Sequence, residues 1–442
     1  MATLDASIVN IALPTLTKEL GPGLNQMKWV VTSYLLVITC LLLPFGRLSD
    51  QKGRKFFFQM GYLIFIFGSS LCGVASHLSA LVVFRGIQAV GASMLMANGP
   101  AIITSVFSTR ERGSALGTLA MVVSTGLVVG PSLGGFLITN IGWRSIFWIN
   151  IPIGFLGLFF ASRFQSEDRA KTQIPFDWLG TFLQTLLLLL FITVFDPPRI
   201  SVSGSLPISF SRWLAIGLLL VFLAIFMKVE GSIRHPLFDL SLLRNRNFWT
   251  ANLAGFLTFV AFSSVTVLMP FFLEEVLFLA PHTAGLYMTS IPLTIFVVAP
   301  LSGRLSDRLG SQGLRILGTS VGCIGLLAMA GVFGAGIHEH SSNSSIILAL
   351  CSIGFAMGLF QSPNNNVIMG SVPTNKLGVA SAVLATIRNL GLVTGTCMST
   401  TLFTWQMAVS QSFVRAFHGT LFVAGMMALG ALLVAAGKLK SS

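Results

Sequence analysis

Apolar stretches of about the length that crosses a membrane recur along this chain and restrict it to one class of fold. A membrane-spanning helix needs roughly 20 apolar residues. Fourteen such stretches are predicted, at 1–20, 29–48, 56–76, 79–106, 113–139, 144–164, 176–195, 213–232, 247–273, 282–302, 314–336, 345–370, 378–403 and 418–437. The alternating segments of ~10 residues that are typical of a membrane β-barrel are not found. The prediction is therefore an all-α polytopic membrane protein with spans grouped as six, two and six.

Composition and charge support this class and exclude others. Hydrophobic residues make up 54% of the chain and charged residues 9%, which is too apolar for a soluble protein. A net charge of +13 is compatible with nucleic-acid binding, but the positive residues are spread over alternate loops. Because Lys and Arg favour cytoplasmic loops, we expect both termini in the cytoplasm. We expect membrane lipid as a partner, and no nucleic acid.

The residues that would indicate catalysis or cofactor binding are scattered. The five cysteines lie in predicted spans and the six histidines in loops or at span ends, so neither an enzyme nor a metal site is expected. Charge rings or a carbonyl filter, as in channels, are not seen. A Gly-rich phosphate loop with its Lys is also missing from the sequence, which argues against ATP. An ion gradient, with no cofactor, is the expected energy source.

A short charged motif is written twice. Residues 46–53 read GRLSDQKG and residues 303–310 read GRLSDRLG, with six identities at an offset of 257 residues. Each copy follows the second span of a group of six. Because an even number of spans separates the copies, both face the same side of the membrane. Two parallel repeats of this kind describe the halves of a major facilitator transporter, with the substrate path between them.

Further motifs resemble one branch of that superfamily. Residues 46–55 resemble its cytoplasmic loop motif, 4–14 (LDASIVNIALP) the first-span signature of the fourteen-span drug/proton antiporters, and 81–92 (LVVFRGIQAVGA) a fourth-span motif with a buried Arg. Residues 126–135 (GLVVGPSLGG) resemble the fifth-span antiporter motif, and 143–154 (WRSIFWINIPIG) is also typical of the family. The motifs cover most of 1–154. The remainder matches through 303–310 and the general pattern.

This resemblance implies a major facilitator fold with two parallel six-helix halves and two extra central spans. The expected domains are 1–165, a two-span insert with linkers at 166–240, and 241–442. The implied function is proton-coupled export of lipophilic small molecules or drugs by alternating access. The alternative is an exporter or facilitator of one specific metabolite or lipid, with or without proton coupling. A monomer in the plasma membrane (the bacterial inner membrane) is expected.

Proton coupling is assigned to the ionisable residues that lie within predicted spans, because a charge in hydrocarbon costs on the order of 3 kcal/mol or more and is rarely idle. Asp5 is the carboxylate of this kind, and Arg85 is a permanent cation that can pair with it. Alternatively, Asp5 anchors the first helix at the membrane interface. Asp5 lies four residues after Met1, about 6 Å along a helix, whereas the resembled family places more apolar residues before it. Either the natural chain is longer, or Asp5 lies near the cytoplasmic face.

Two groups of residues are expected to control the conformational change. In the repeated motif, Gly46 and Gly53 would permit close backbone approach, Asp50 would cap a helix, and Arg54 would pair across the halves. The matching residues of the second copy are Gly303 and Asp307. In the fifth span, Gly126, Gly130 and Gly134 form one small-residue face that permits tight helix contact. The adjacent residues are Gly135 and Pro131, which can introduce a kink. Simple packing is the alternative for this span.

Substrate contacts are expected from polar and aromatic residues within spans. The candidates are Asn10, Tyr34, Gln88, Asn98, Gln361, Asn364, Asn365 and Arg388. The 37 Phe and 16 Met residues would suit a broad apolar cavity, although most such residues in a membrane protein face lipid or neighbouring helices. Glu274 and Glu275 end the ninth span, and no further acid resembles those proposed to bind cationic drugs, so dicationic substrates are disfavoured.

Overall fold

The computed structural model describes residues 1–21, 23–106, 112–163, 177–195, 208–233, 245–334, 336–339, 341–373 and 377–437, and most of these residues are helical. The N half contains α1 (Ala2–Leu20), α2 (Leu24–Met27), α3 (Trp29–Lys52), α4 (Arg54–Gly73), α5 (Leu78–Val106), α6 (Arg112–Asn140), α7 (Ser145–Trp148) and α8 (Asn150–Arg163). Two central helices follow, α9 (Trp178–Phe195) and α10 (Ile208–Ser232). The C half contains α11 (Arg246–Phe271), the π-helical segment η2 (Phe272–Val276), α12 (Pro281–Leu309), α13 (Ser311–Met329), α14 (Asn343–Gly370), α15 (Leu377–Ser410) and α16 (Phe413–Ala436).

The predicted all-α membrane fold is confirmed. Thirteen helical stretches within the described residues are long and apolar enough to cross a membrane. The predicted first span, α1, is a helix of 19 residues but is more polar, since it carries Asp5, Lys18 and Glu19. It lies inside the bundle rather than against lipid, and it completes the predicted set of fourteen. The predicted domain borders at 165 and 240 lie outside the described residues.

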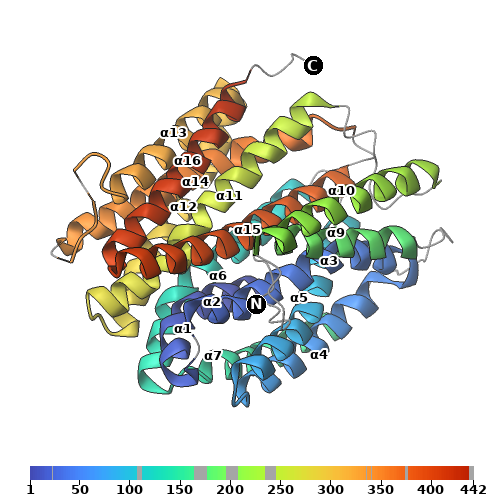
Figure 1. The fold of residues 1–442 in the computed structure, drawn as a ribbon. Helices are drawn as coiled ribbons and strands as arrows, with labels where there is room; N and C mark the ends of the chain where they lie inside the picture. Colours follow the sequence, from blue (N-terminus) through green and yellow to red (C-terminus); the bar gives the residue numbers. More distant parts are fainter. Residues whose placement is uncertain are drawn as a thin grey trace.

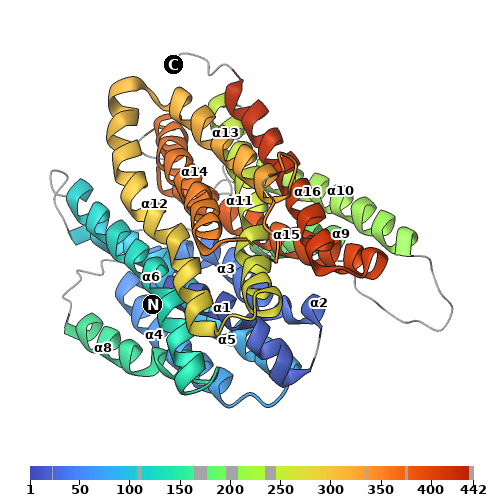
Figure 2. The same ribbon diagram turned by 90° about the vertical axis from the view of Figure 1, so that its left-hand side faces the viewer.

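The two halves pack through equivalent helices. The second long helix of the N half, α3, packs on the fifth of the C half, α15, and the fifth of the N half, α6, packs on the second of the C half, α12. This exchange is what two parallel repeats related by an axis along the membrane normal produce. Figures 1 and 2 show the halves as two separate bundles, with α9 beside α3 and α15.

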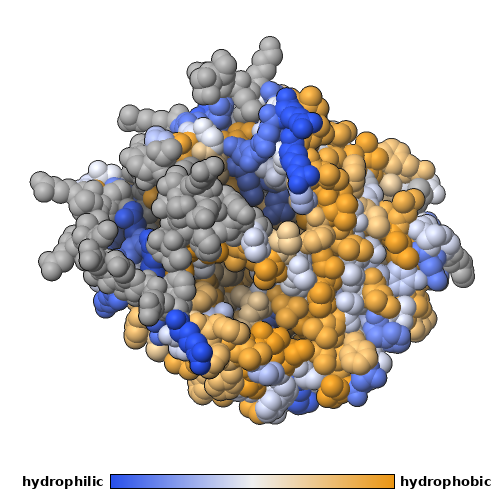
Figure 3. All heavy atoms as spheres, turned by 180° about the vertical axis from the view of Figure 1, so that it is seen from behind, coloured by the Kyte–Doolittle hydropathy of each residue, from blue (hydrophilic) through white to orange (hydrophobic). Residues whose placement is uncertain are grey.

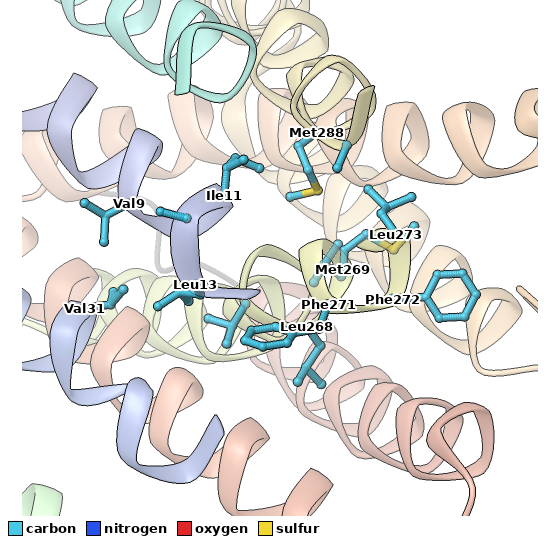
Figure 4. Packing of buried hydrophobic residues seen from close by; sticks show 14 of the residues in the cluster. Val9, Ile11, Leu13, Val31, Leu268, Met269, Phe271, Phe272, Leu273 and Met288 are labelled. Atoms are coloured by element: carbon cyan, nitrogen blue, oxygen red, sulfur yellow. The ribbon is translucent and has the colours of Figure 1, made fainter. Parts of the chain in front are cut away.

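The two ends of the bundle differ. At the basic face, α3 turns into α4 at Gly53 and α12 turns into α13 at Gly310, beside Lys52, Arg54 and Arg308. At the closed face, α1 and α6 end and α12 begins. Here an apolar cluster joins the halves (Figure 4), and we call it the seam. Its residues include Val9, Ile11 and Leu13 of α1, Val31 of α3, Leu268, Met269 and Phe271 of α11, Phe272 and Leu273 of η2, and Met288 of α12.

Away from the seam, other apolar clusters draw their buried residues mainly from one half. One cluster around Phe65 and Ala92 belongs to the N half, and another around Phe248 and Val383 belongs to the C half. A smaller cluster joins α3, α9 and α15 through Leu36, Ile192 and Val393. The seam, with members from α1, α11 and α12, is the apolar contact that joins the halves at the closed face.

Outward-facing side chains are apolar over large areas. Hydrophobic residues cover much of the face seen in Figure 3. On α10, Trp213 is 70% exposed and Leu220 is 61% exposed. In water such surface would be a strong interaction or aggregation site, whereas in a bilayer it faces lipid tails. The chain is a multi-pass membrane protein.

The repeated motif is more helical than predicted. Residues 46–52 and 303–309 are the last turns of α3 and α12, not loops, because hydropathy measures burial in lipid and does not show where a helix ends. The turns themselves are made by Gly53 and Gly310, whose φ angles of 106° and 85° disfavour other residues. The two copies therefore build equivalent helix ends.

Candidate functional site

Asp5 lies at the centre of a buried polar cluster in the N half. It is in the first turn of α1 and is 1% exposed, and Arg85 of α5 is fully buried beside it. The Arg85 guanidinium forms an ion pair with the Asp5 carboxylate. The structure thus brings together the two residues that sequence reasoning assigned to proton coupling. Asp5 is enclosed by helices of its own half.

Two amides complete the shell around the carboxylate. Gln88 Nε2 donates to Asp5 Oδ1 at 3.0 Å, and Asn150 Nδ2 donates to the same oxygen at 2.7 Å. Asn150 begins α8 and Gln88 lies one turn after Arg85 on α5. An ionised carboxylate only accepts hydrogen bonds, and all three neighbours donate. A proton on Asp5 would place a donor against a donor unless one of these partners moved.

Arg85 is held from the other side by backbone and by an aromatic ring. Its Nε donates to the Val30 carbonyl at 3.2 Å, and its Cζ lies 3.9 Å from the centre of the Tyr34 ring. The Tyr34 hydroxyl donates to the Ala2 carbonyl at 3.1 Å. Arg85 Nη2 is buried without a hydrogen-bond partner among the described residues. Tyr34 and Gln88, which were predicted as substrate contacts, belong instead to this Asp5 cluster.

Sequence reasoning missed Asn150 and Ser69. Ser69 of α4 accepts hydrogen bonds from Gln88 and from Asn150, both at 3.1 Å, and donates to the Phe147 carbonyl at 2.9 Å. Asn150 lies within the stretch 143–154 that resembled the family, so a polar residue there was a usable signal. Ser69 had none, because a Ser in a span is commonly satisfied by its own helix.

The glycine motif of α6 packs against other helices on two sides. Gly126, Gly130 and Gly134 all face α1, and a β-carbon on Gly130 would lie 2.7 Å from Ser7 Cβ. On the other side, Gly135 and Pro131 meet α12: a methyl group on Gly135 would collide with the Pro281 carbonyl oxygen. The small residues therefore fix α1 within its half and let α6 touch the opposite half at the closed face.

The repeated motif makes local contacts at the basic face. Arg54 Nη2 lies 2.8 Å from Asp50 Oδ1, four residues away, so these two residues pair within one turn of the motif. The pairing of Arg54 across the halves stays a prediction. Gly46 has open space around it instead of a close backbone neighbour. Asp50 does not cap α4, which begins at Gly53 without a side-chain cap.

The second copy of the motif is also locally bonded. Asn366 Nδ2 donates to Asp307 Oδ1 at 3.5 Å, and a β-carbon on Gly303 would lie 2.8 Å from Ser362 Oγ. Both contacts are with α14 of the same half.

A recess in the C half gathers four of the predicted substrate residues. It lies between α11, α14 and α15 and is a shallow, partly open recess with a cavity volume of about 20 Å³. We call it the C-half recess, and its polar and aromatic lining is Asn252, Phe259, Gln361, Asn364, Asn365 and Arg388. Asn252 was not predicted, since nothing in its sequence neighbourhood marks it. The remaining lining residues are Gly255, Ile368, Leu384 and Ile387.

Asn10 and Asn98 do not belong to either group. The Asn10 side chain lies on α1 with a buried carbonyl oxygen that has no partner among the described residues. Asn98 Nδ2 donates to the Met94 carbonyl at 2.8 Å, which is a bond within its own helix. Neither arrangement brings these residues to the recess.

A helical membrane protein with two repeated halves, joined at one face and carrying a buried ion pair in one half, has the architecture of a secondary carrier. Comparison with known proteins gives the family. Residues 1–396 match the model of the Major Facilitator Superfamily, and the chain belongs to that superfamily. Members are transporters of small-molecule substrates.

Individual relatives point to more than one kind of cargo. The chain is 36% identical to the riboflavin transporter RibZ of Clostridioides difficile, over 93% of this chain and 88% of that protein. It is 30% identical to the multidrug resistance protein Stp of Mycobacterium tuberculosis, over 89% of this chain and 72% of Stp. It is 26% identical to the multidrug transporter protein MdtP of Bacillus subtilis, over 90% and 72%.

Proposed function

We propose that this chain is a proton-coupled carrier, not an enzyme, that exports small molecules across the plasma membrane by alternating access. The observation that carries the proposal is the Asp5–Arg85 ion pair, buried where a charge is costly. The basic face is the cytoplasmic one under this proposal, because positive residues favour that side. Both termini are then cytoplasmic, and one chain is the working unit.

The Asp5 cluster supports a simple coupling cycle. In this cycle the arrangement with three donors on the Asp5 carboxylate represents the state after a proton has been released to the cytoplasm. Protonation of Asp5 from the other side removes its attraction for Arg85, and the guanidinium then retains Gln88, the Val30 carbonyl and the Tyr34 ring as partners. A change in this pairing shifts α1 against α5, and α1 carries part of the seam.

The seam supplies the link from protonation to gating. Asp5 and the seam residues Val9 and Leu13 lie on one helix, and Leu13 packs in the same apolar cluster as Leu268 of the C half. A displacement of α1 therefore acts on the contact between the halves. The proton gradient is the energy source in this scheme, and no cofactor takes part.

Two kinds of cargo are proposed, each on a separate observation. Lipophilic drugs are the first, supported by the multidrug relatives Stp and MdtP and by the abundance of Phe and Met. A single polar metabolite such as riboflavin is the second, supported by the relative RibZ and by the amide and guanidinium lining of the C-half recess. The recess favours the second cargo class, because amide and charged groups offer little to a purely lipophilic compound.

Transport by the purified chain in proteoliposomes under an imposed pH gradient tests the proposal. The panel contains ethidium, a neutral lipophilic dye and riboflavin. Wild-type chain should move at least one of them against its gradient, and Asp5→Asn should abolish this accumulation while keeping substrate exchange. Glu339→Gln, which changes an exposed loop carboxylate, is the matched control. Gradient-driven accumulation by Asp5→Asn at the wild-type rate would refute coupling through Asp5.

A further inference from the structure

The C-half recess contains a cation without a counter-ion. Arg388 lies on α15 and is half-buried, and it has no hydrogen bond or ion pair with any residue in the described part of the chain. A guanidinium presents five N–H donors in a planar fork that matches paired acceptor oxygens. Left unpartnered inside a membrane protein it is costly. The group that completes this site therefore carries oxygen acceptors.

The same recess also contains unused acceptors. Asn364 Nδ2 donates to the Ala251 carbonyl at 3.1 Å, and Asn252 Nδ2 donates to the Phe248 carbonyl at 2.8 Å. Each amide is thereby fixed with its nitrogen toward backbone. The Oδ1 atoms of both residues are buried and have no partner among the described residues. A buried acceptor without a hydrogen-bond donor lowers the stability of the protein.

Arg388 presents hydrogen-bond donors and the two amide oxygens present acceptors. A ligand that satisfies all of them must therefore carry both acceptors and a donor along one edge. We propose that the C-half recess binds the edge of a planar heterocycle in which an N–H group is adjacent to ring carbonyls, as in a cyclic imide. The carbonyls accept from Arg388, the N–H donates to an amide oxygen of Asn252 or Asn364, and Phe259 provides an aromatic surface for the ring. The inference deepens the second cargo class proposed above and rests on that proposed function.

Other ligand classes fit less well. An organic cation would be repelled by the positive charge of Arg388. A carboxylate would satisfy Arg388 but has no hydrogen for the buried amide oxygens. A hydrocarbon would leave both sets of polar atoms unsatisfied. The imide edge is the chemistry that matches donors and acceptors together.

The recess adjoins the parts that couple transport. Ala385, one turn before Arg388 on α15, packs against the N-half cluster that contains Tyr34. The Tyr34 ring lies against Arg85, the partner of Asp5. A ligand held by Arg388 thus lies on the helix that touches the Asp5 cluster from the opposite half.

Lumiflavin and 3-methyllumiflavin are the test probes, because they share one fluorescent planar ring and differ in the imide N–H. Binding to the purified full-length chain in detergent is followed by fluorescence. Lumiflavin should bind at least ~10-fold more tightly than the methylated probe, because methylation leaves a buried amide oxygen without its donor. Arg388→Gln and Asn364→Leu should each lower the affinity for lumiflavin by a similar factor. Arg246→Gln is the control, because Arg246 is an exposed cation at the start of α11 that does not line the recess, and this variant should bind lumiflavin as the wild type does.

The outcomes separate this inference from the transport proposal. Equal binding of the two probes by the wild-type chain, no lumiflavin binding, or displacement of lumiflavin by ethidium would overturn it, and these comparisons need no variant to fold. Fluorescein, which has a carboxylate and no imide, should bind weakly. Tight binding of fluorescein would instead mean that the recess recognises an anion and that the imide proposal is wrong. If lumiflavin binds as expected but a pH gradient does not drive its transport, the proposed binding site is supported and the proposed proton-coupled export is contradicted. Asp5→Asn should retain lumiflavin binding.

Discussion

Gly285 of α12 lies against the carbonyl oxygen of Pro131 of α6, so the two halves touch backbone to backbone at the closed face. A methyl group at Gly285 would collide with that oxygen, and the nearby Gly135 is equally tight against Pro281. Small residues are what permit helices in a membrane to approach this closely. The contact is specific to the present state, because α6 must leave α12 here when this face opens.

Gly285→Ala is therefore expected to weaken closure and to shift the carrier toward opening at this face. Leu13→Cys, placed in the seam of a chain whose native cysteines are replaced, reports the shift by its rate of thiol labelling. We expect labelling to rise several-fold in Gly285→Ala. Gly217→Ala on α10, where an added methyl meets open space, should leave the rate unchanged. Unaltered labelling in Gly285→Ala would show that the helices move aside at little cost.

Thr32 of α3 and Cys397 of α15 form a second contact between the halves, with Oγ1 and Sγ 3.9 Å apart. Thr32→Cys is expected to form a disulfide with native Cys397 under mild oxidation, since the side chains already meet. The bond should hold the closed face shut and stop transport, and a reductant should restore it. The control is Thr32→Cys with Cys397→Ser. Full transport by the oxidised, cross-linked protein would exclude opening between these helices.

The Asp5–Arg85 pair should show strong coupling in stability as well as in transport. Arg85→Ala leaves a buried carboxylate without its charged partner and should cost on the order of 3–5 kcal/mol of unfolding free energy. Asp5→Asn combined with Arg85→Gln removes both charges and should recover most of that loss. Arg415→Ala, at an exposed site, should change stability by about 0.5 kcal/mol or less. Thermal unfolding in detergent measures all three, and additive effects of the two cluster substitutions would argue against a coupled pair.

The two copies of the repeated motif are expected to differ in their importance for transport turnover. The first copy continues with Lys52, Arg54 and Lys55, whereas the second has Arg308 and no Arg-Lys pair. In the opposite state, in which the basic face closes, Asp50 and Arg54 should leave their local pairing and make contacts across the halves. Asp50→Asn should then cut turnover severely and Asp307→Asn mildly. Transport rates matched for expression decide this, and equal defects would mean that the copies act symmetrically.

Sequence patterns predicted the membrane fold well, because hydropathy and length report directly on burial in lipid. They also predicted the meeting of Asp5 and Arg85, since isolated charges within apolar spans have few possible partners. The grouping of the polar residues was harder. Asn252 joins Arg388 in the recess, while Tyr34 and Gln88 join Asp5, and these assignments depend on how each helix is rotated against its neighbours. Helix ends were displaced for a different reason, as polar residues 46–52 continue a helix beyond the apolar stretch.

The Asp5–Arg85 pair, which is proposed to exchange protons, lies in α1 and α5, whereas the recess proposed to bind cargo lies in α11, α14 and α15. On this arrangement, substitutions in the second half can change the substrate selectivity while the proton-coupling residues of the first half stay unchanged. The superfamily's breadth of cargo is understandable on this basis. Chimeras that join residues 1–163 of this chain to the corresponding second half of a relative should inherit the gradient dependence of one parent and the selectivity of the other.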